Sequence, residues 1–356
     1  MKWLRVSFSQ AYFDPVKSIS LPVNTTDDDL RQVAGLTSLE EIELHRTHVT
    51  DAGISHLAVL TSLKVLNLSN TQVTDSGMAH LAGMTSLEIL HLENTQVTDD
   101  GLAHLEGLKS LRALHIRNTQ ITDNGLSRIG RMKSLIGLSL SGTQLTDAGL
   151  THLAGLTSLN SLLLKNTQVS DSGLLHLAGL KSMRVLDLSR TEVTGSGFSD
   201  LSGLKQLDTL YLDESQVTDD GLAGVALLTS LTQLTLNQTP VGDAGLHHLG
   251  FLKSLALLDV SDTQVKGDGL HHLAHLKSLE SLVLNDTAIT DSGLAQLRDF
   301  PSLTALGLSN TLVTDSGLDH LAGIKSLENL TLSGTQVTDE GIATFRLAVP
   351  RCLIRR

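Results

Sequence analysis

The chain has 356 residues and a net charge of −12, from 26 Lys and Arg against 38 Asp and Glu. This acidic balance excludes nucleic acid from the expected partners, because binding to a phosphate backbone needs a broad cationic face. Cys352 is the only cysteine, which rules out an intrachain disulfide and favours a reducing compartment. Residues 1–15 lack the apolar core of a secretory signal, and no later run approaches the roughly 18 apolar residues that span a bilayer. We therefore expect a cytoplasmic protein without membrane insertion.

Residues 1–38 are expected to form an amino-terminal cap. The segment VKSISLPVNTTDDDLRQVAGLTSL, which begins at Val16, is a degenerate copy, one residue short, of the unit that repeats through the rest of the chain. Ahead of this segment stand Trp3, Phe8, Tyr12 and Phe13. The end of a stack of repeats must cover an exposed core, and these aromatic side chains suit that role.

Residues 39–350 consist of thirteen 24-residue repeats with the shared pattern L-x-x-L-x-L-x-x-T-x-V-T-D-x-G-L-x-x-L-x-G-L-x-S. The repeats begin at Leu39, Leu63, Leu87, Leu111, Leu135, Leu159, Met183, Leu207, Leu231, Leu255, Leu279, Leu303 and Leu327. Positions 4 and 6 alternate as in a short strand, whereas positions 16, 19 and 22 follow the spacing of one helical face. Each repeat is therefore predicted to contain a strand, a turn and a short helix.

Seven positions of the repeat, 1, 4, 6, 11, 16, 19 and 22, are apolar in nearly every copy. A single repeat cannot bury its own apolar face, but repeats stacked in register share one continuous core. The pattern thus predicts a right-handed α/β solenoid. Ile354 falls at position 4 of a last, partial repeat, so residues 351–356 are expected to close the stack as a final strand.

The segment LKVLNLSNTQVTDSGMAHLAGMTSLEIL, from residue 63, resembles a leucine-rich repeat of the ribonuclease-inhibitor-like class. It is similar to the 24-residue variety of many bacterial proteins, which is related to the cysteine-containing repeats of F-box proteins. The resemblance extends from about residue 25 to the end of the chain. It implies a curved horseshoe, with a parallel β-sheet on the concave face and short helices on the convex face.

Two further columns of the repeat are expected to support this frame. Position 9 carries Thr in every repeat except one, which has Ser215, whereas leucine-rich repeats usually have Asn or Cys there. A buried hydroxyl needs a partner, so we expect each to bond the backbone of its turn. Position 15 is Gly in all thirteen repeats, and the Asp that usually stands two residues earlier suits a helix N-cap.

The sequence Asp-Ser-Gly at Asp75, Asp171, Asp291 and Asp315 is also how the catalytic loop of an aspartic protease reads. Such a dyad needs two loops that face each other closely enough to share a proton. Parallel stacking places every copy on the same edge. We therefore expect these carboxylates to cap helices rather than to catalyse a reaction.

The side chains at positions 3, 5, 7 and 8 are expected to point outward from the concave face. Positions 5 and 7 have no consensus, and the charge along them changes from mixed or basic in the earlier repeats to acidic in the later ones. Rigid aromatic side chains and mixed charges are typical anchors of protein interfaces. The predicted partner-binding residues are His91, Glu93, His115, Arg117, Lys165, Asp187, Arg190, Tyr211, Asp213, Glu214 and Asp259. The alternative, a solvated face whose residues have drifted, stays open.

Eight of the fifteen histidines occupy position 18, a pattern more typical of repeat inheritance than of chemistry. His271 and His275 lie four residues apart on one predicted helix, a spacing that can hold Zn²⁺ if the neighbouring repeat adds a ligand. We favour inheritance and assign no metal. Repeats 7 to 10 break the consensus at Gly195, Gly242 and Gly267, which indicates either a functional surface or neutral drift.

These observations predict a non-enzymatic scaffold, monomeric and without a cofactor, that binds a protein or peptide through the concave face across repeats 3 to 10. One alternative is an enzyme or enzyme regulator that acts at the acidic patch of Asp187, Asp213 and Asp259, with or without a divalent cation. Hard cations need converging carboxylates, however, and these three lie on separate strands. The other alternative is a purely structural spacer or surface protein.

Overall fold

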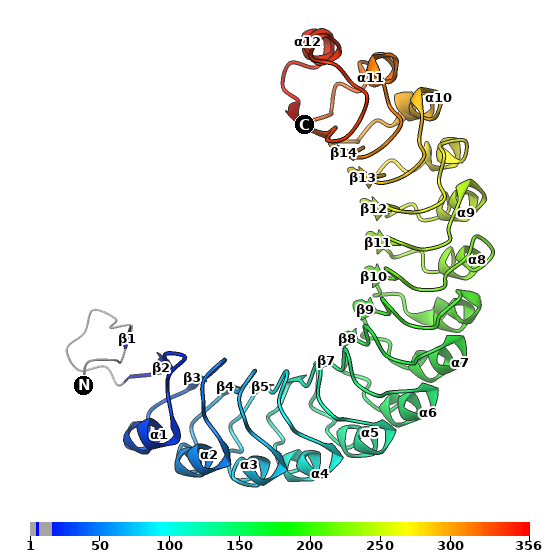
Figure 1. The fold of residues 1–356 in the computed structure, drawn as a ribbon. Helices are drawn as coiled ribbons and strands as arrows, with labels where there is room; N and C mark the ends of the chain where they lie inside the picture. The colour runs from blue at the N-terminus through cyan, green and yellow to red at the C-terminus, as the bar shows by residue number, and fades with distance from the viewer. Residues whose placement is uncertain (1–4, 7–15) are drawn as a thin grey trace. The chain divides into compact units, whose positions relative to one another are not determined.

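The computed structural model describes residues 5–6 and 16–356 (Figure 1). The predicted cap residues Trp3, Phe8, Tyr12 and Phe13 lie outside the described residues. The chain divides into two compact units, which we call the N unit (residues 1–168 and 179–183) and the C unit (residues 169–178 and 184–356).

In the N unit, a three-residue strand and a short helix alternate from β2 onward. Its strands are β1 (Arg5–Val6), β2 (Ser18–Ser20), β3 (Glu41–Glu43), β4 (Val65–Asn67), β5 (Ile89–His91), β6 (Ala113–His115), β7 (Gly137–Ser139) and β8 (Ser161–Leu163). Its α-helices are α1 (Asp27–Val33), α2 (Asp51–Leu57), α3 (Asp75–Ala79), α4 (Asp99–Leu102), α5 (Asp123–Ile129) and α6 (Asp147–Leu150). Short 3₁₀ turns, Ala103–Leu105 and Thr151–Leu153, extend α4 and α6.

The C unit repeats this alternation with more 3₁₀ segments. Its strands are β9 (Val185–Asp187), β10 (Thr209–Tyr211), β11 (Gln233–Thr235), β12 (Leu257–Asp259), β13 (Ser281–Val283), β14 (Ala305–Gly307), β15 (Asn329–Thr331) and β16 (Leu353–Arg355). Its α-helices are α7 (Asp171–Leu174), α8 (Leu222–Val225), α9 (Asp243–Leu249), α10 (Asp291–Leu294), α11 (Asp315–Leu321) and α12 (Asp339–Ala348). Its 3₁₀ segments are Leu175–Leu177, Ser196–Gly203, Leu270–Leu273 and Ala295–Asp299.

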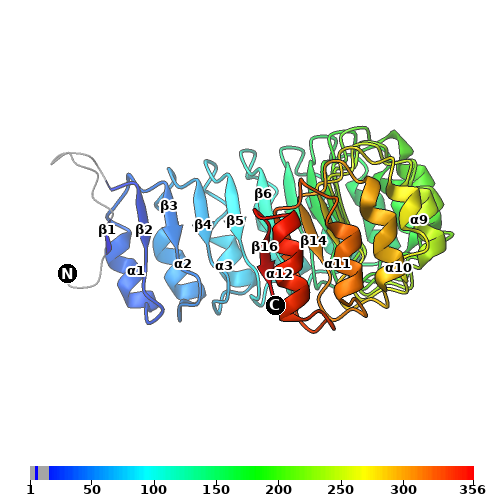
Figure 2. The same ribbon diagram turned by 90° about the horizontal axis from the view of Figure 1, so that it is seen from above.

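Within each unit the strands pair in chain order and form an open parallel sheet, except that β1 runs antiparallel to β2. From β3 onward a residue pairs with the one 24 positions later, as His91 does with His115. The strands lie on one face of each unit and the helices on the other (Figure 1), and Figure 2 shows β2 to β5 side by side. The predicted α/β solenoid with a parallel sheet is confirmed.

The predicted apolar columns form the core of both units. Leu63, Leu66, Leu68, Val73 and Leu81, which represent positions 1, 4, 6, 11 and 19 of one repeat, are all 0 % exposed. Burial of a side chain of this size contributes about 1.5–3 kcal/mol. Because no repeat is closed on its own, most of that gain depends on the neighbouring repeats.

The helix starts of successive repeats are joined by a hydrogen-bonded pair of Asp and Thr. In α3, Thr74 is the N-cap, and its hydroxyl accepts the N–H of Ser76. The carboxylate of Asp51, in the preceding repeat, accepts both the N–H of Thr74, at 2.8 Å, and its hydroxyl, at 2.6 Å. The same pair recurs as Asp27–Thr50, Asp75–Thr98, Asp99–Thr122, Asp123–Thr146, Asp291–Thr314 and Asp315–Thr338.

The predicted role of Asp as the N-cap of its own helix is therefore wrong. The cap is the Thr before it, and the Asp, at the first helical position, serves the next repeat. Asp75, Asp291 and Asp315 use both carboxylate oxygens in this way, and Asp171 holds the hydroxyl of Thr194. These carboxylates are structural links.

In the regular repeats, the same link explains the glycine at position 15. A Cβ added to Gly77 or Gly101 would lie closer to the carboxylate oxygen of Asp51 or Asp75 than real Cβ atoms come to any neighbour. Both glycines are buried near the start of a helix. The glycine is thus required by the space that the preceding carboxylate fills.

The hydroxyl column at position 9 behaves as predicted. Each Thr, and Ser215 in its place, donates its hydroxyl to the carbonyl three residues earlier, as Thr119 does to Ile116 at 2.6 Å. One residue earlier, position 8 has a left-handed backbone in all thirteen repeats, with φ between 52° and 72°. Asn, Asp and Gly, which adopt this conformation at least cost, occupy most of these positions.

Two irregular repeats are joined to the preceding repeat by a different set of hydrogen bonds. Gly195 and Gly267 have φ of 109° and 114°, and each leads into a 3₁₀ segment in place of an α-helix. Asp171 then accepts the N–H groups of Gly195 and Gly197, and Asp243 does the same for Gly267 and Gly269. These two breaks in the consensus therefore have a structural cause, because a positive φ of this size is practical only for glycine.

The Asp–Gly contact predicts a strong coupling between Asp75 and Gly101. Gly101→Ala should lower the free energy of unfolding by about 1–3 kcal/mol, because the methyl overlaps the carboxylate. In the Asp75→Ala background the carboxylate is gone and the contact with Cγ1 of Val97, at 3.0 Å, remains, so the same change should cost less, which gives a coupling energy of about 1 kcal/mol or more. Urea unfolding followed by circular dichroism measures all four proteins. Asp100→Ala, at an exposed neighbouring position, is the control, and additive effects of the two substitutions would contradict the contact.

At Gly242, a substitution is expected to raise the stability of the protein. It stands at the N-cap position with φ −123°, where Thr fits, and its N–H already donates to Asp219 at 2.7 Å. Gly242→Thr should stabilise the protein by about 1 kcal/mol, because the new hydroxyl can reach Asp219 and cap α9. Gly242→Val has the same shape without the hydroxyl and should give no gain. Equal thermal stability of the two variants would show that the hydroxyl has no role in the contact with Asp219.

Candidate functional site

The candidate site is the strand face, which we define as the outward side chains at repeat positions 3, 5 and 7. Position 8, which was also predicted to point outward, has a left-handed backbone and follows position 7 in the turn after each strand. Arg190 and Glu214 occupy this position. They form an ion pair with each other, with 2.7 Å between Nη2 and Oε1.

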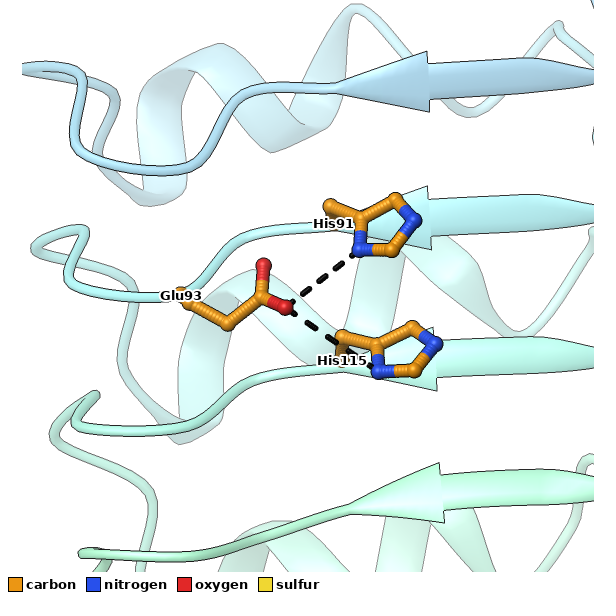
Figure 3. Close-up of side chains that lie close together, drawn as sticks. All are labelled: His91, Glu93 and His115. Carbon is orange, nitrogen blue, oxygen red and sulfur yellow. Dashed lines mark hydrogen bonds and ion pairs between the residues drawn. The ribbon is translucent and has the colours of Figure 1, made fainter. Parts of the chain in front are cut away.

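In the N unit, the strand face brings His91, Glu93 and His115 together (Figure 3). His91 ends β5 and His115 ends β6, and their rings stack with centroids 4.4 Å apart and planes inclined by 12°. Glu93 Oε1 lies 3.3 Å from Nδ1 of His91 and 4.0 Å from Nδ1 of His115. All three side chains are partly buried, with 22–31 % of their surface exposed.

Glu93 is held by a chain of polar side chains from the preceding repeats. Ser69 donates its hydroxyl to Oε2 of Glu93 and also lies 2.7 Å from Oδ1 of Asn67. Asn67 in turn donates its amide to Glu43 at 2.6 Å. Sequence reasoning did not select Asn67, Ser69 or Glu43, although all three occupy the same columns as the histidines and Glu93.

The charges of the cluster follow from these contacts. Burial acts to raise the pKa of Glu93, but hydrogen bonds from His91 and Ser69 lower it to about 2, so the carboxylate is ionised at neutral pH. The hydrogen bond to Glu93 raises the pKa of His91. Burial and the charge of His91 lower the pKa of His115. The Glu93 carboxylate therefore faces two different imidazoles. His91 binds its proton more strongly than a free imidazole does, and His115 binds it less strongly.

Arg117 and Lys165 complete the predicted set in the N unit. Arg117 is exposed and Lys165 is half-buried, and neither forms an ion pair among the described residues. They are not part of the His91–Glu93–His115 cluster. Both cations are available to groups outside the chain.

In the C unit, the strand face is acidic around Tyr211. Tyr211 pairs in register with Asp187 on one side and Thr235 on the other, and Thr235 pairs with Asp259. Asp213 lies two residues after Tyr211 and accepts the N–H of Asn237 at 2.9 Å. Burial, with the nearby charges of Asp259 and Asp187, raises the pKa of Asp213.

The helix side does not form the histidine site that the sequence allowed. The 3₁₀ segment with His271 ends at Leu273, so His275 lies beyond it and the two residues do not share a helical face. The hydrogen bonds instead link His247 and His272, whose Nδ1 atoms are 3.5 Å apart. His247 is exposed, and its ring also meets Phe251 edge to face.

None of the helices among the described residues has the length and apolar character that crossing a bilayer requires.

Comparison with known proteins shows that repeat proteins have a similar fold. An internalin from Listeria monocytogenes aligns with a TM-score of 0.68 and 23 % identity, covering 92 % of this chain and 93 % of its own. A leucine-rich repeat protein from Leptospira interrogans aligns with a TM-score of 0.68 and 19 % identity, covering 96 % of this chain and 90 % of its own. At these identities the similarity shows the fold.

A plant peptide hormone receptor, solved in complex with RGF2, aligns with a TM-score of 0.56 and 16 % identity. The alignment covers 94 % of this chain and 59 % of that receptor. A search among curated proteins returned no match. The protein-family model described as leucine-rich repeat region matches residues 44–345, which is most of the chain. The chain therefore belongs to the leucine-rich repeat family.

Proposed function

We propose that this chain is a non-enzymatic scaffold that binds a protein or peptide through its strand face. The observation that carries the proposal is the contrast between alternate positions of each strand. Positions 4 and 6 are apolar and buried in repeat after repeat, whereas positions 5 and 7 vary in charge, size and polarity. Leucine-rich repeat proteins generally mediate protein–protein interactions, which supports this assignment.

The C unit favours a partner segment that carries positive charge. Asp187 pairs with Tyr211 across β9 and β10, and Asp259 lies on β12, two strands beyond Tyr211. Burial, together with repulsion from the charges of Asp259 and Asp187, raises the pKa of Asp213. A Lys or Arg from a partner would relieve this repulsion. Tyr211 adds a rigid ring with a polar end, the kind of side chain that anchors many interfaces.

The N unit offers a different chemistry. Arg117 and Lys165 present positive charge without ion-pair partners among the residues that the structure describes. Carboxylates or backbone carbonyls of a partner are suitable acceptors for both. Mixed charges of this kind increase the association rate and the specificity of binding more than they increase affinity.

The enzymatic alternative has less support. The carboxylates of Asp187, Asp213 and Asp259 do not form a metal-ligand group among the described residues. Asp187 and Asp259 accept the N–H groups of Ser189 and Ser261, each at 2.9 Å. Burial also raises the pKa of the Cys352 thiol to about 11, so it carries little thiolate at neutral pH.

We also propose that the repeats are of the ribonuclease-inhibitor-like, 24-residue bacterial variety. The 24-residue register of the strands and the bacterial source of two similar structures support this subclass.

An affinity capture experiment tests the strand face directly. The full chain is compared with a strand-face variant in which five residues are replaced by Ser: His91, Arg117, Lys165, Tyr211 and Asp213. A protein captured by the wild type should be lost with this variant, and Tyr211→Ala alone should weaken its binding by about 10-fold or more, which corresponds to about 1.4 kcal/mol or more. Calorimetry with the captured protein measures the affinity.

The matched control replaces five exposed residues outside the strand face by Ser: Asp100, His104, Lys277, Asp319 and His320. This control should capture the same protein as the wild type. Capture lost only with the control would move the site to the helix side. Identical recovery with all three proteins would favour the spacer role.

A further inference from the structure

Repeats 3 and 4 place three metal-binding side chains together on the strand face of the N unit (Figure 3). The ligand atoms of His91, Glu93 and His115 all lie within 4.8 Å of one another. Among the described residues, this is the only group of three His, Cys, Asp or Glu side chains that meets such a limit. The figure shows Nδ1 of both rings on the side that faces the carboxylate.

We propose that His91, Glu93 and His115 form a binding site for one Zn²⁺ ion. Two imidazole nitrogens and one carboxylate oxygen are a ligand set that suits Zn²⁺, whereas Ca²⁺ and Mg²⁺ prefer oxygen ligands alone. Tetrahedral zinc with bonds of about 2.0–2.1 Å places its ligand atoms roughly 3.3 Å apart. The His91–Glu93 separation already matches at 3.3 Å, and the His115–Glu93 separation is 4.0 Å.

The nitrogens of the two imidazoles lie within 4.8 Å of each other, so they must draw closer by up to about 1.5 Å to share one ion. Both are outward side chains on adjacent strands, so rotation about their own side-chain bonds is enough and the backbone can stay fixed. The rings are stacked against each other and not locked by other ring contacts among the described residues. The strand register sets the separation of the two residues, and the side chains set the final geometry.

The polar chain behind Glu93 supports the assignment. Ser69 holds Oε2, which leaves Oε1 directed at the two histidines. Groups that orient a ligand in this way are typical of metal sites, and their loss usually costs 10–100-fold in metal affinity. Ser69 is therefore assigned as a positioning residue, and its backbone N–H donates to Oδ1 of Asn67 at 3.0 Å.

Zn²⁺ would take the place of the present contact between Nδ1 of His91 and Oε1 of Glu93, which are 3.3 Å apart. A metal binds neutral imidazole nitrogens and an ionised carboxylate, so its binding releases protons. Three protein ligands would leave a fourth zinc position open to solvent, where water or a side chain of another protein can bind.

The helix-side histidines provide a comparison within the same chain. His247 and His272 come close, but no third ligand joins them within the limit that the strand-face cluster meets, among the described residues. Two imidazoles without a third ligand hold a cation less firmly than a supported set of three. This inference does not depend on the proposed partner, so its failure would leave the scaffold function untouched.

Zinc titration of the tag-free full chain tests the site. Calorimetry should give one Zn²⁺ per chain at this site, with a dissociation constant in the micromolar range or below. His91→Ala, Glu93→Ala and His115→Ala should each weaken binding by about 100-fold or more, and Ser69→Ala by about 10-fold or more. Co²⁺ bound in place of Zn²⁺ should give the visible absorption of a four-coordinate site in the wild type but not in the His91, Glu93 and His115 variants.

The double variant His247→Ala/His272→Ala is the matched control and should bind Zn²⁺ as the wild type does. Thermal unfolding of each protein without metal shows whether the variants are folded, and Zn²⁺ should raise the wild-type Tm but not that of the three ligand variants. Absence of binding, equal affinity in the ligand variants, or loss of binding only in the control would each overturn the proposal.

Discussion

The structure depends on one repeated joint, in which the carboxylate of an Asp at a helix start holds the Thr that caps the helix of the next repeat. The joint uses both carboxylate oxygens, one for the Thr N–H and one for its hydroxyl, as between Asp99 and Thr122. Helices of four to seven residues are too short to be stable alone in water. The joint satisfies their first N–H groups and also fixes the register of each repeat on the one before it.

The register has a functional consequence. Because strands pair 24 residues apart, side chains in the same column of neighbouring repeats lie side by side on the strand face. His91 and His115 meet only for this reason, and Glu93 joins them from position 7 of the earlier repeat. Similarly, Asp187 and Asp259 are brought near Tyr211 by the register of β9 to β12. The backbone repeats almost unchanged, so the binding properties of the strand face depend on which residues occupy positions 3, 5 and 7.

Much of this could be predicted from the sequence, because the repeat displays each structural requirement thirteen times. The apolar columns, the parallel strands and the hydroxyl ladder at position 9 all follow from local periodicity and from the need to satisfy buried polar groups. The role of Asp could not be assigned in this way. Its partner lies 23 residues away, and the pattern Thr-Asp-x-Gly fits both a cap within one helix and a link to the next. The left-handed φ of Gly195 and Gly267 is likewise a property of the folded backbone.

The candidate site was predicted in part. The columns that face outward, and most of the residues in them, could be chosen from the repeat, but the approach of His91, Glu93 and His115 depends on rotamers and on the support of Ser69. The most direct measurement is a crystal structure of the chain grown with Zn²⁺, with anomalous data at the zinc edge. We expect one peak, bound by Nδ1 of His91, Nδ1 of His115 and the carboxylate of Glu93. A peak at His247 and His272, or none on the strand face, would contradict it.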